Sequence, residues 1–154
     1  MKKILNTFFL IFVGTVIIVA DQLTKLWALQ NCKNELVINN FLSCHQVFNP
    51  GISWSLFDNL NSFGFWSLTF FIFLIIVALS VYAYRRFKEG YNIIAEILVI
   101  SGAASNLVDR ILYNAVVDFI ILHYGEWKFP VFNIADSAIT FGVFLMLFNL
   151  FTEK

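Results

Sequence analysis

Two aspartates lie in surroundings that favour carboxylate chemistry. Asp118 stands between apolar residues 115–117 and 119–121, which is unlike the setting of a solvated surface charge. Asp136 lies in the sequence FNIADSAI, at the predicted outer start of the last apolar helix. Two buried carboxylates that lie close together do not both ionise easily, so one keeps its proton. Such a pair provides a base that activates water and an acid that polarises a scissile carbonyl, as in aspartic proteases.

Each aspartate also has a structural interpretation when it is taken alone. Asp118 would serve as a helix cap, and Asp136 would stabilise the N-terminus of the last helix through its charge. These alternatives are as well supported by the local sequence as catalysis is, so further residues must decide between them.

A second group of polar residues follows one face of the third apolar stretch. Gly102, Asn106 and Arg110 are spaced by four residues, so a helix places them on a common face. The amide of Asn106 offers a donor and an acceptor, and Arg110 is able to hold a carboxylate or a carbonyl. Close helix packing also explains Gly102. An interfacial stop signal also explains Arg110, and we prefer that interpretation for its neighbour Asp109.

Polar residues of three apolar stretches reach a similar depth. Asp21 and Lys25 are spaced i, i+4 and able to pair, either within a site or as a simple interfacial ion pair. Helical rise places Asp21 about 25 Å from the inner end of its stretch, and Asn106 and Asp136 about 22 Å from theirs. That level is near the outer boundary of a hydrocarbon core about 30 Å thick. A shared polar site that opens outward is therefore predicted.

The composition requires that apolar helices position these residues. Of the 154 residues, 60% are hydrophobic and only 13% are charged, which excludes an ordinary soluble domain and a disordered chain. The 10 basic residues equal the 10 acidic ones, so no basic excess points to a nucleic-acid partner. The length fits one domain, residues 1–154.

Four stretches are long and apolar enough to be read as membrane spans, at about residues 4–29, 62–84, 91–112 and 131–151. The first is expected to be a retained helix, because Ile18 is not the small residue that signal cleavage after Ala20 would need. The distribution of Lys and Arg predicts that both termini are cytoplasmic. The four tryptophans, Trp27, Trp54, Trp66 and Trp127, fall near the outer ends of the spans. Glu96 is expected to reach the inner interface or to pair with a neighbour, and it is assigned no role.

The connections on the predicted outer side are residues 30–61 and 112–128. Within the first, residues 36–38 and 44–48 are predicted as short strands, and Asn49-Pro50-Gly51 alone reads as an ordinary turn. Cys32 and Cys44 share this segment, where a disulfide is permitted, but their spacing leaves the pairing open. His45 and His123 lack partners at metal-ligand spacing. The fold expected is an all-α integral membrane protein with four transmembrane helices and a small β-rich extracytoplasmic cradle between helices 1 and 2.

Five segments in order resemble the motifs of the lipoprotein signal peptidase (signal peptidase II) family. They are DQLTK (21–25), FNPGISWSL (48–56), SGAASNLVDRI (101–111), VVDFI (116–120) and FNIADSAI (132–139). One motif alone would be weak, but five in order on four predicted spans are specific. The second motif departs from the family pattern at Ile52 and Trp54, which bears on lipid or substrate contacts and not on the chemistry.

The resemblance implies an aspartic endopeptidase of the bacterial plasma (inner) membrane. Its substrates would be diacylglyceryl-modified prolipoproteins, cut before the lipidated cysteine, and the cyclic peptide globomycin would bind the site. No metal and no organic cofactor is implied, the other partner would be membrane lipid, and the protein is expected to be a monomer. The motifs match Asp118 and Asp136 to the catalytic pair. The positions matched to substrate binding or support of the site are Asp21, Lys25, Asn49, Gly51, Gly102, Asn106, Arg110, Asn133 and Ala135.

Two functions of other classes compete with this interpretation. A small transporter or proton channel would use Asp21, Asp118 and Asp136 as a relay, but a relay needs acids at several depths and these cluster at one. A membrane scaffold without catalysis would tolerate Asp-to-Asn changes at positions 118 and 136. A further hypothesis is that residues 122–128, with Trp127, form a flap over the site, because this segment lies between the two aspartates.

Overall fold

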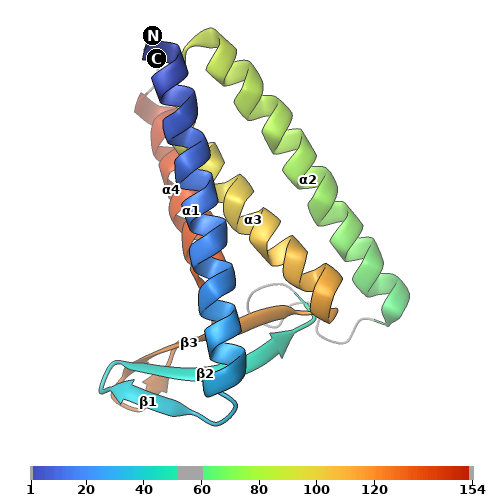
Figure 1. The fold of residues 1–154 in the computed structure, drawn as a ribbon, viewed down its shortest axis with the longest axis vertical. Helices are drawn as coiled ribbons and strands as arrows, with labels where there is room; N and C mark the ends of the chain where they lie inside the picture. Colours follow the sequence, from blue (N-terminus) through green and yellow to red (C-terminus); the bar gives the residue numbers. More distant parts are fainter. Residues whose placement is uncertain (1, 52–60, 153–154) are drawn as a thin grey trace.

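The computed structural model describes residues 2–51 and 61–152, and this part of the chain contains four long helices and a small sheet. The helices are α1 (Lys2–Asn31), α2 (Ser62–Glu89), α3 (Ile94–Tyr113) and α4 (Ile134–Thr152). They run alongside one another, with α3 in contact with α1, α2 and α4 (Figure 1). The first turn of α1, the last turn of α4 and the α2–α3 connection lie at one end of the bundle, and the sheet lies at the other (Figure 1).

The sheet corrects the predicted location of the β-rich cradle. Its four strands are β1 (Leu36–Asn39), β2 (Leu42–Asn49), β3 (Val116–Tyr124) and β4 (Trp127–Lys128), in the order β1-β2-β3-β4, and every pairing is antiparallel. The two strands predicted between helices 1 and 2 are confirmed with wider bounds. The other two follow α3, so both outer connections build the cradle.

The helix boundaries follow from local capping. Asn61 caps α2 by accepting a hydrogen bond from Gly64 N (2.9 Å), and Gly90 ends that helix with φ 95°, a left-handed conformation that glycine adopts without strain. Asn114 ends α3 with φ 54°. Helix α2 therefore continues five residues beyond the predicted residue 84, because charged Arg85, Arg86 and Lys88 are compatible with a helix that leaves the apolar layer.

Three helical segments are long and apolar enough to cross a membrane: Asn6–Asn31, Ser62–Glu89 and Ile134–Thr152. Helix α3 forms near its predicted position but is not among them, because Glu96, Asp109 and Arg110 reduce its apolar character. Those three side chains are buried. The polar residues of α3 thus face protein, which is the arrangement expected of a helix surrounded by three others.

Close contact between α3 and α4 depends on glycine. A Cβ atom on Gly102 would lie 2.5 Å from the carbonyl oxygen of Ala135 and 2.8 Å from Ile139 Cγ1. A Cβ atom on Gly142 would lie 2.8 Å from the carbonyl oxygen of Ala95. The helix-packing interpretation of Gly102 is therefore correct, and the contact brings the first turn of α4 against the middle of α3.

A disulfide joins the end of α1 to the sheet. Cys32 and Cys44 are bonded, with their Cα atoms 5.6 Å apart, and this decides the pairing that spacing left open. The bond lies in a buried apolar cluster with Ala28 and Phe119. Strands β2 and β3 are thereby fixed beneath α1. Trp27, Trp66 and Trp127 are exposed near this end, whereas Trp54 and Ile52 lie outside the described residues.

Candidate active site

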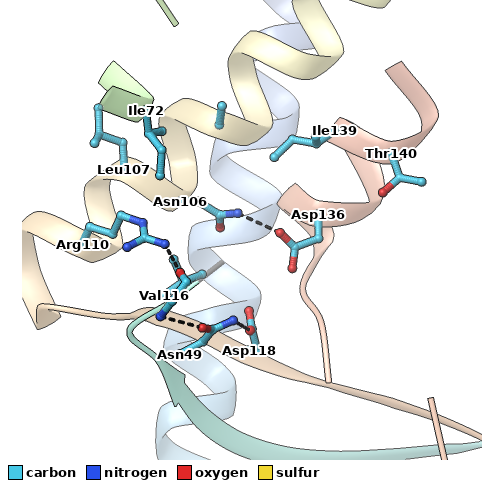
Figure 2. A pocket seen from close by; sticks show the side chains of 12 residues that line it. Asn49, Ile72, Asn106, Leu107, Arg110, Val116, Asp118, Asp136, Ile139 and Thr140 are labelled. Carbon is cyan, nitrogen blue, oxygen red and sulfur yellow. Dashed lines mark hydrogen bonds between the residues drawn. The ribbon is translucent and has the colours of Figure 1, made fainter. Parts of the chain in front are cut away.

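A cavity of about 230 Å³ lies where α2, α3 and α4 meet the sheet (Figure 2). It contains both aspartates that were predicted to be catalytic, Asp118 from β3 and Asp136 from α4. Its other walls are mostly apolar. The lining residues are Asn49, Gly51, Ile72, Ala103, Asn106, Leu107, Arg110, Val116, Asp118, Asp136, Ile139 and Thr140.

Asp118 is held by two side-chain amides. It lies on β3 opposite Val47 of β2, and only 3% of its surface is exposed. One carboxylate oxygen accepts from Asn49 Nδ2 (3.0 Å) and the other from Asn133 Nδ2 (2.7 Å). Burial and the nearby charge of Asp136 raise the pKa of Asp118 to about 7, although the two amide hydrogen bonds act in the opposite direction.

Asp136 both caps a helix and faces the cavity. Its backbone N–H donates to Asn133 Oδ1 (2.8 Å), and its Oδ2 accepts from the N–H of Asn133 (3.3 Å), which is a reciprocal capping box at the start of α4. Its Oδ1 accepts from Asn106 Nδ2 (2.9 Å). The helix-terminus interpretation of Asp136 is thus correct and compatible with a place in the cavity (Figure 2).

Asn133 connects the two aspartates. Its side-chain amide donates to Asp118, while its side-chain oxygen accepts from the backbone of Asp136. The same NH₂ group lies 3.2 Å from Asn106 Oδ1. Because Asn133 is fully buried, the amide fixes the position of one carboxylate relative to the other.

Behind the cavity, a buried lysine makes three polar contacts. Lys25 Nζ lies 2.7 Å from Asp21 Oδ2, 2.7 Å from Asp109 Oδ2 and 2.8 Å from Asn106 Oδ1. An ammonium group has three protons to donate, so its hydrogen-bonding capacity is filled. The predicted pairing of Asp21 with Lys25 is confirmed, and it is buried rather than interfacial.

Asp21 connects three helices. Its Oδ1 accepts from the backbone N–H of Ala135 on α4 (2.8 Å), and its Oδ2 accepts from Ser105 Oγ on α3 (2.7 Å). Ala135 is fully buried and therefore cannot contact a ligand in the cavity. Five of the predicted residues lie behind the cavity wall rather than on it: Asp21, Lys25, Gly102, Asn133 and Ala135.

The interfacial interpretation of Asp109 is wrong. Asp109 is fully buried, pairs with Lys25, and accepts hydrogen bonds from Gln22 Nε2 (2.9 Å) and from the N–H of Val117 (3.1 Å). It therefore positions the strand that carries Asp118. Gln22 and Ser105 were also missed. The available signal was spacing, since Ser105 and Asp109 are four residues apart on α3 and face the polar residues of α1.

Arg110 holds backbone rather than a carboxylate. Its Nη1 donates to the carbonyl of Pro50 (3.2 Å) and its Nη2 donates to the carbonyl of Gly51. The ring of Phe65 packs against the guanidinium, with its centroid 5.5 Å from Arg110 Cζ. Gly51 N in turn donates to Asn49 Oδ1 (3.0 Å), so Asn49 is oriented with its NH₂ toward Asp118. Strand β2 thus ends in a bend at Pro50 and Gly51 that the side chain of Asn49 closes, and Asn49 and Gly51 also line the cavity.

The predicted flap, residues 122–128, consists of the end of β3, a turn and β4. It does not line the cavity, and its motion stays a prediction.

His123 Nε2 lies 2.6 Å from Ser43 Oγ and 3.8 Å from Glu35 Oε1, so its neighbours are a hydroxyl and a carboxylate. Within residues 2–51 and 61–152, no group of three or more His, Cys, Asp or Glu side chains is placed to hold a metal ion. Glu96 pairs with Arg86 (2.8 Å), as one of its two predicted alternatives required.

Known proteins resemble the chain in sequence and in structure. The family described as signal peptidase (SPase) II matches residues 13–152. The lipoprotein signal peptidase of Blochmanniella pennsylvanica is 36% identical over 151 residues, covering 93% of this chain and 88% of the relative. That of Pseudoalteromonas atlantica is 30% identical and covers 94% and 90%. A solved structure described as a bacterial membrane enzyme superposes with a TM-score of 0.75 at 29% identity, covering 94% of this chain and 88% of the other.

The apolar helices and these neighbours define a multi-pass membrane enzyme. The chain belongs to the signal peptidase II family of aspartic peptidases, as the five motifs predicted.

Proposed function

We propose that the chain is an aspartic endopeptidase that removes the signal peptide from diacylglyceryl-modified prolipoproteins, cutting before the lipidated cysteine. The observation that carries the proposal is the placement of Asp118 and Asp136 on the wall of one cavity, joined through Asn133. Family membership supports the substrate class, because the relatives are lipoprotein signal peptidases.

The two carboxyl groups share one proton at neutral pH, consistent with a pKa of about 7 for Asp118. The ionised group takes a proton from a water molecule, and the water oxygen attacks the carbonyl carbon of the scissile bond. The protonated group donates its proton to the carbonyl oxygen. The tetrahedral intermediate then collapses: the carboxylate that gave up its proton takes one back from a hydroxyl of the intermediate, and the carbonyl re-forms as the C–N bond breaks. The carboxyl group that holds the water proton donates it to the leaving amine, which restores the starting state of the pair. Asn49, Asn106 and Asn133 hold the carboxyl groups in place throughout.

The other predicted site residues support this reaction. Lys25 and Asp21 fix α1, α3 and α4 around the cavity, and the N–H of Ala135 is held by Asp21. Arg110 holds the carbonyls of Pro50 and Gly51 at the cavity edge. Gly102 lets the first turn of α4 approach α3. Substrate backbone would meet Asn49, Gly51 and Arg110, which line the cavity.

We further propose that residues 1–154 form one monomeric peptidase domain with four membrane spans. Helix α3 would cross the membrane shielded by α1, α2 and α4, which explains how it tolerates buried charges. Both termini would face the cytoplasm, and the sheet and the cavity would lie at the outer surface of the bacterial plasma membrane. There water and a substrate whose acyl chains remain in the bilayer are able to meet.

The test is cleavage of a diacylglyceryl-modified prolipoprotein by the purified protein in lipid, with Asp118→Asn and Asp136→Asn alongside. Each variant is expected to lose at least about a hundredfold in kcat, the contribution of a general acid or base. Glu126→Gln is the matched control, because this exposed carboxylate lies outside the cavity. Unmodified precursor should be cut poorly by the wild type.

A folded wild type that never cuts the modified precursor would contradict the proposal. Normal cleavage by both Asp-to-Asn variants would contradict the catalytic assignment and favour a scaffold. Folding of each variant is checked by its thermal transition, so that loss of activity is not confused with loss of structure.

A further inference from the structure

A second polar feature lies at the end of the bundle away from the sheet. Glu96, in the first turn of α3, has 2% of its surface exposed. Its Oε1 lies 2.8 Å from Arg86 Nε, but its Oε2 is buried and has no hydrogen-bond partner among the described residues. A buried carboxylate oxygen without a donor is costly, so this oxygen is an acceptor available to a group from outside the chain.

Glu96 lines a cavity of about 350 Å³ between α2, α3 and α4. The lining residues are Tyr82, Arg86, Glu96, Val143, Met146, Leu147, Asn149 and Leu150. The walls are mainly apolar, and the acceptor lies with Asn149 among a small number of polar groups. This combination fits a basic side chain, because its methylene stem packs on apolar surface while its charged head reaches a carboxylate.

The catalytic cavity and the Glu96 cavity take walls from the same three helices. Along α3, Glu96 and Asn106 are separated by about 15 Å, and along α4 Asp136 and Asn149 are separated by about 20 Å. A signal peptide has a basic n-region followed by an apolar h-region of about 7–15 residues, which spans roughly 10–22 Å as a helix. The separation of the two cavities therefore falls within the length of the apolar h-region, which lies between the basic end and the cleavage-site residues.

We propose that the Glu96 cavity binds a Lys or Arg of the substrate's n-region, with the Glu96 carboxylate as its acceptor. This inference rests on the proposed function, since it assigns the basic end of the same substrate. Binding of the basic end in this cavity would position the apolar helix of the signal peptide so that the cleavage site lies beside the catalytic aspartates.

A phospholipid amine is the alternative occupant, and the structure favours it less. A zwitterionic headgroup also needs a cation for its phosphate, and Arg86 is the one cation among the described lining residues. That guanidinium is already paired with Glu96 and packed against the rings of Tyr82 (5.7 Å) and Tyr91 (4.6 Å). The acceptor on Glu96 is thus better matched to a cation that brings no phosphate.

The experiment compares three modified prolipoproteins that carry Lys, Gln or Glu at the n-region position. For the wild-type protein, kcat/KM is expected to be about tenfold lower for the substrate with Gln than for the substrate with Lys, which corresponds to the loss of one charge-assisted hydrogen bond. The difference should lie in KM and not in kcat. Glu96→Gln should cut all three equally well within twofold. Glu96→Asp, which retains the charge, should restore part of the preference. Glu89→Gln is the matched control, because this exposed carboxylate lies outside the cavity.

Equal cleavage of the three substrates by the wild type would overturn the proposal, as would an undiminished preference in Glu96→Gln. An activity loss in Glu96→Gln that is the same for all substrates and depends on ethanolamine phospholipid in the vesicles would assign the cavity to lipid and also overturn it. Kd values of fluorescent Lys and Gln signal peptides for Asp118→Asn repeat the comparison without turnover. A failure of the n-region inference is thereby distinguished from a failure of the peptidase assignment.

Discussion

Asp118 is charged only at the expense of stability. Its carboxyl group is nearly inaccessible to water and faces a second carboxylate, and two amide donors compensate for this incompletely. Its pKa of about 7 lies above the ordinary value of 3.8. Between these values the folded protein retains a proton that the unfolded chain has lost, so the free energy of unfolding falls as pH rises.

The pH dependence of stability is therefore expected to change in Asp118→Asn. The stability that the protonated group contributes is fully present below pH 3.8 and is lost as pH rises through about 7, at up to about 1.4 kcal/mol per pH unit. The variant should lack this decline, so it should gain stability relative to wild type between pH 5 and pH 8. Unfolding in detergent at both pH values measures the difference. Parallel pH profiles for wild type and variant would contradict the pKa assignment, and Glu126→Gln should keep the wild-type profile.

Lys25 is expected to be the most sensitive residue behind the cavity. Lys25→Met leaves Asp21 and Asp109 buried without a counter-charge, and removal of one member of a buried ion pair costs about 3 kcal/mol or more. Lys33→Met, at an exposed position, is the control and should change stability by less than about 0.5 kcal/mol. Unfolding free energies in the same detergent give the comparison. Equal free energies of unfolding for the two variants would show that the three contacts of Lys25 make no net contribution to stability.

The polar residues of the site were more predictable than their partners. Asp118 and Asp136 are recognisable because a carboxylate within apolar sequence is rare. The burial of Asp109 was not predicted, because an Asp-Arg pair near the end of a helix has the same local sequence whether the two side chains face water or protein. Its burial depends on Lys25 in another helix and on Val117 in a strand, and those contacts exist only in three dimensions.

At the scale of the elements, the contact of α3 with α4 determines where Asp136 lies. Replacing a helical glycine by alanine normally stabilises a helix by up to about 1 kcal/mol. Gly102→Ala is expected to destabilise the protein and to lower kcat instead, because its Cβ would lie 2.5 Å from the backbone oxygen of Ala135. Thermal unfolding and turnover measure both effects. Ser80→Ala on exposed α2 is the control, and a stabilised, fully active Gly102→Ala would contradict the close contact.

The sheet shows why long-range pairing was missed. Residues 116–124 form a strand that pairs with β2, and Asn49 lies opposite Val116 although 67 positions separate them in sequence. The apolar run VVDFI gave no indication of a partner so distant. The short strands between α1 and α2 were predictable because their residue types and their turn are local. The helices were predictable from apolar length alone, and their ends moved by a few residues where capping and charge extended or shortened them.

At the scale of the whole molecule, the proposed orientation makes two exposed positions distinguishable. Glu126 lies in the turn beside the sheet and Glu89 lies in the last turn of α2, at the opposite end of the bundle (Figure 1). In intact cells a membrane-impermeant maleimide is expected to label Glu126→Cys and not Glu89→Cys, and to label both after lysis. Cys32 and Cys44 are bonded to each other and should contribute no background. The reverse labelling pattern would contradict cytoplasmic termini.

The residues of the candidate site are far apart in the sequence, so they are synthesised at different times. Asn49, Asp118 and Asp136 come from β2, β3 and α4, and the amide that joins the two acids is the cap of the final helix. A nascent chain in which only β2 and β3 have been synthesised still lacks Asp136 and Asn133, the residue that joins the two aspartates. Under the proposed catalytic assignment, proteolytic capacity would therefore arise only after the segment that carries Asp136 has been synthesised, and products truncated before that segment would not act as proteases in the membrane.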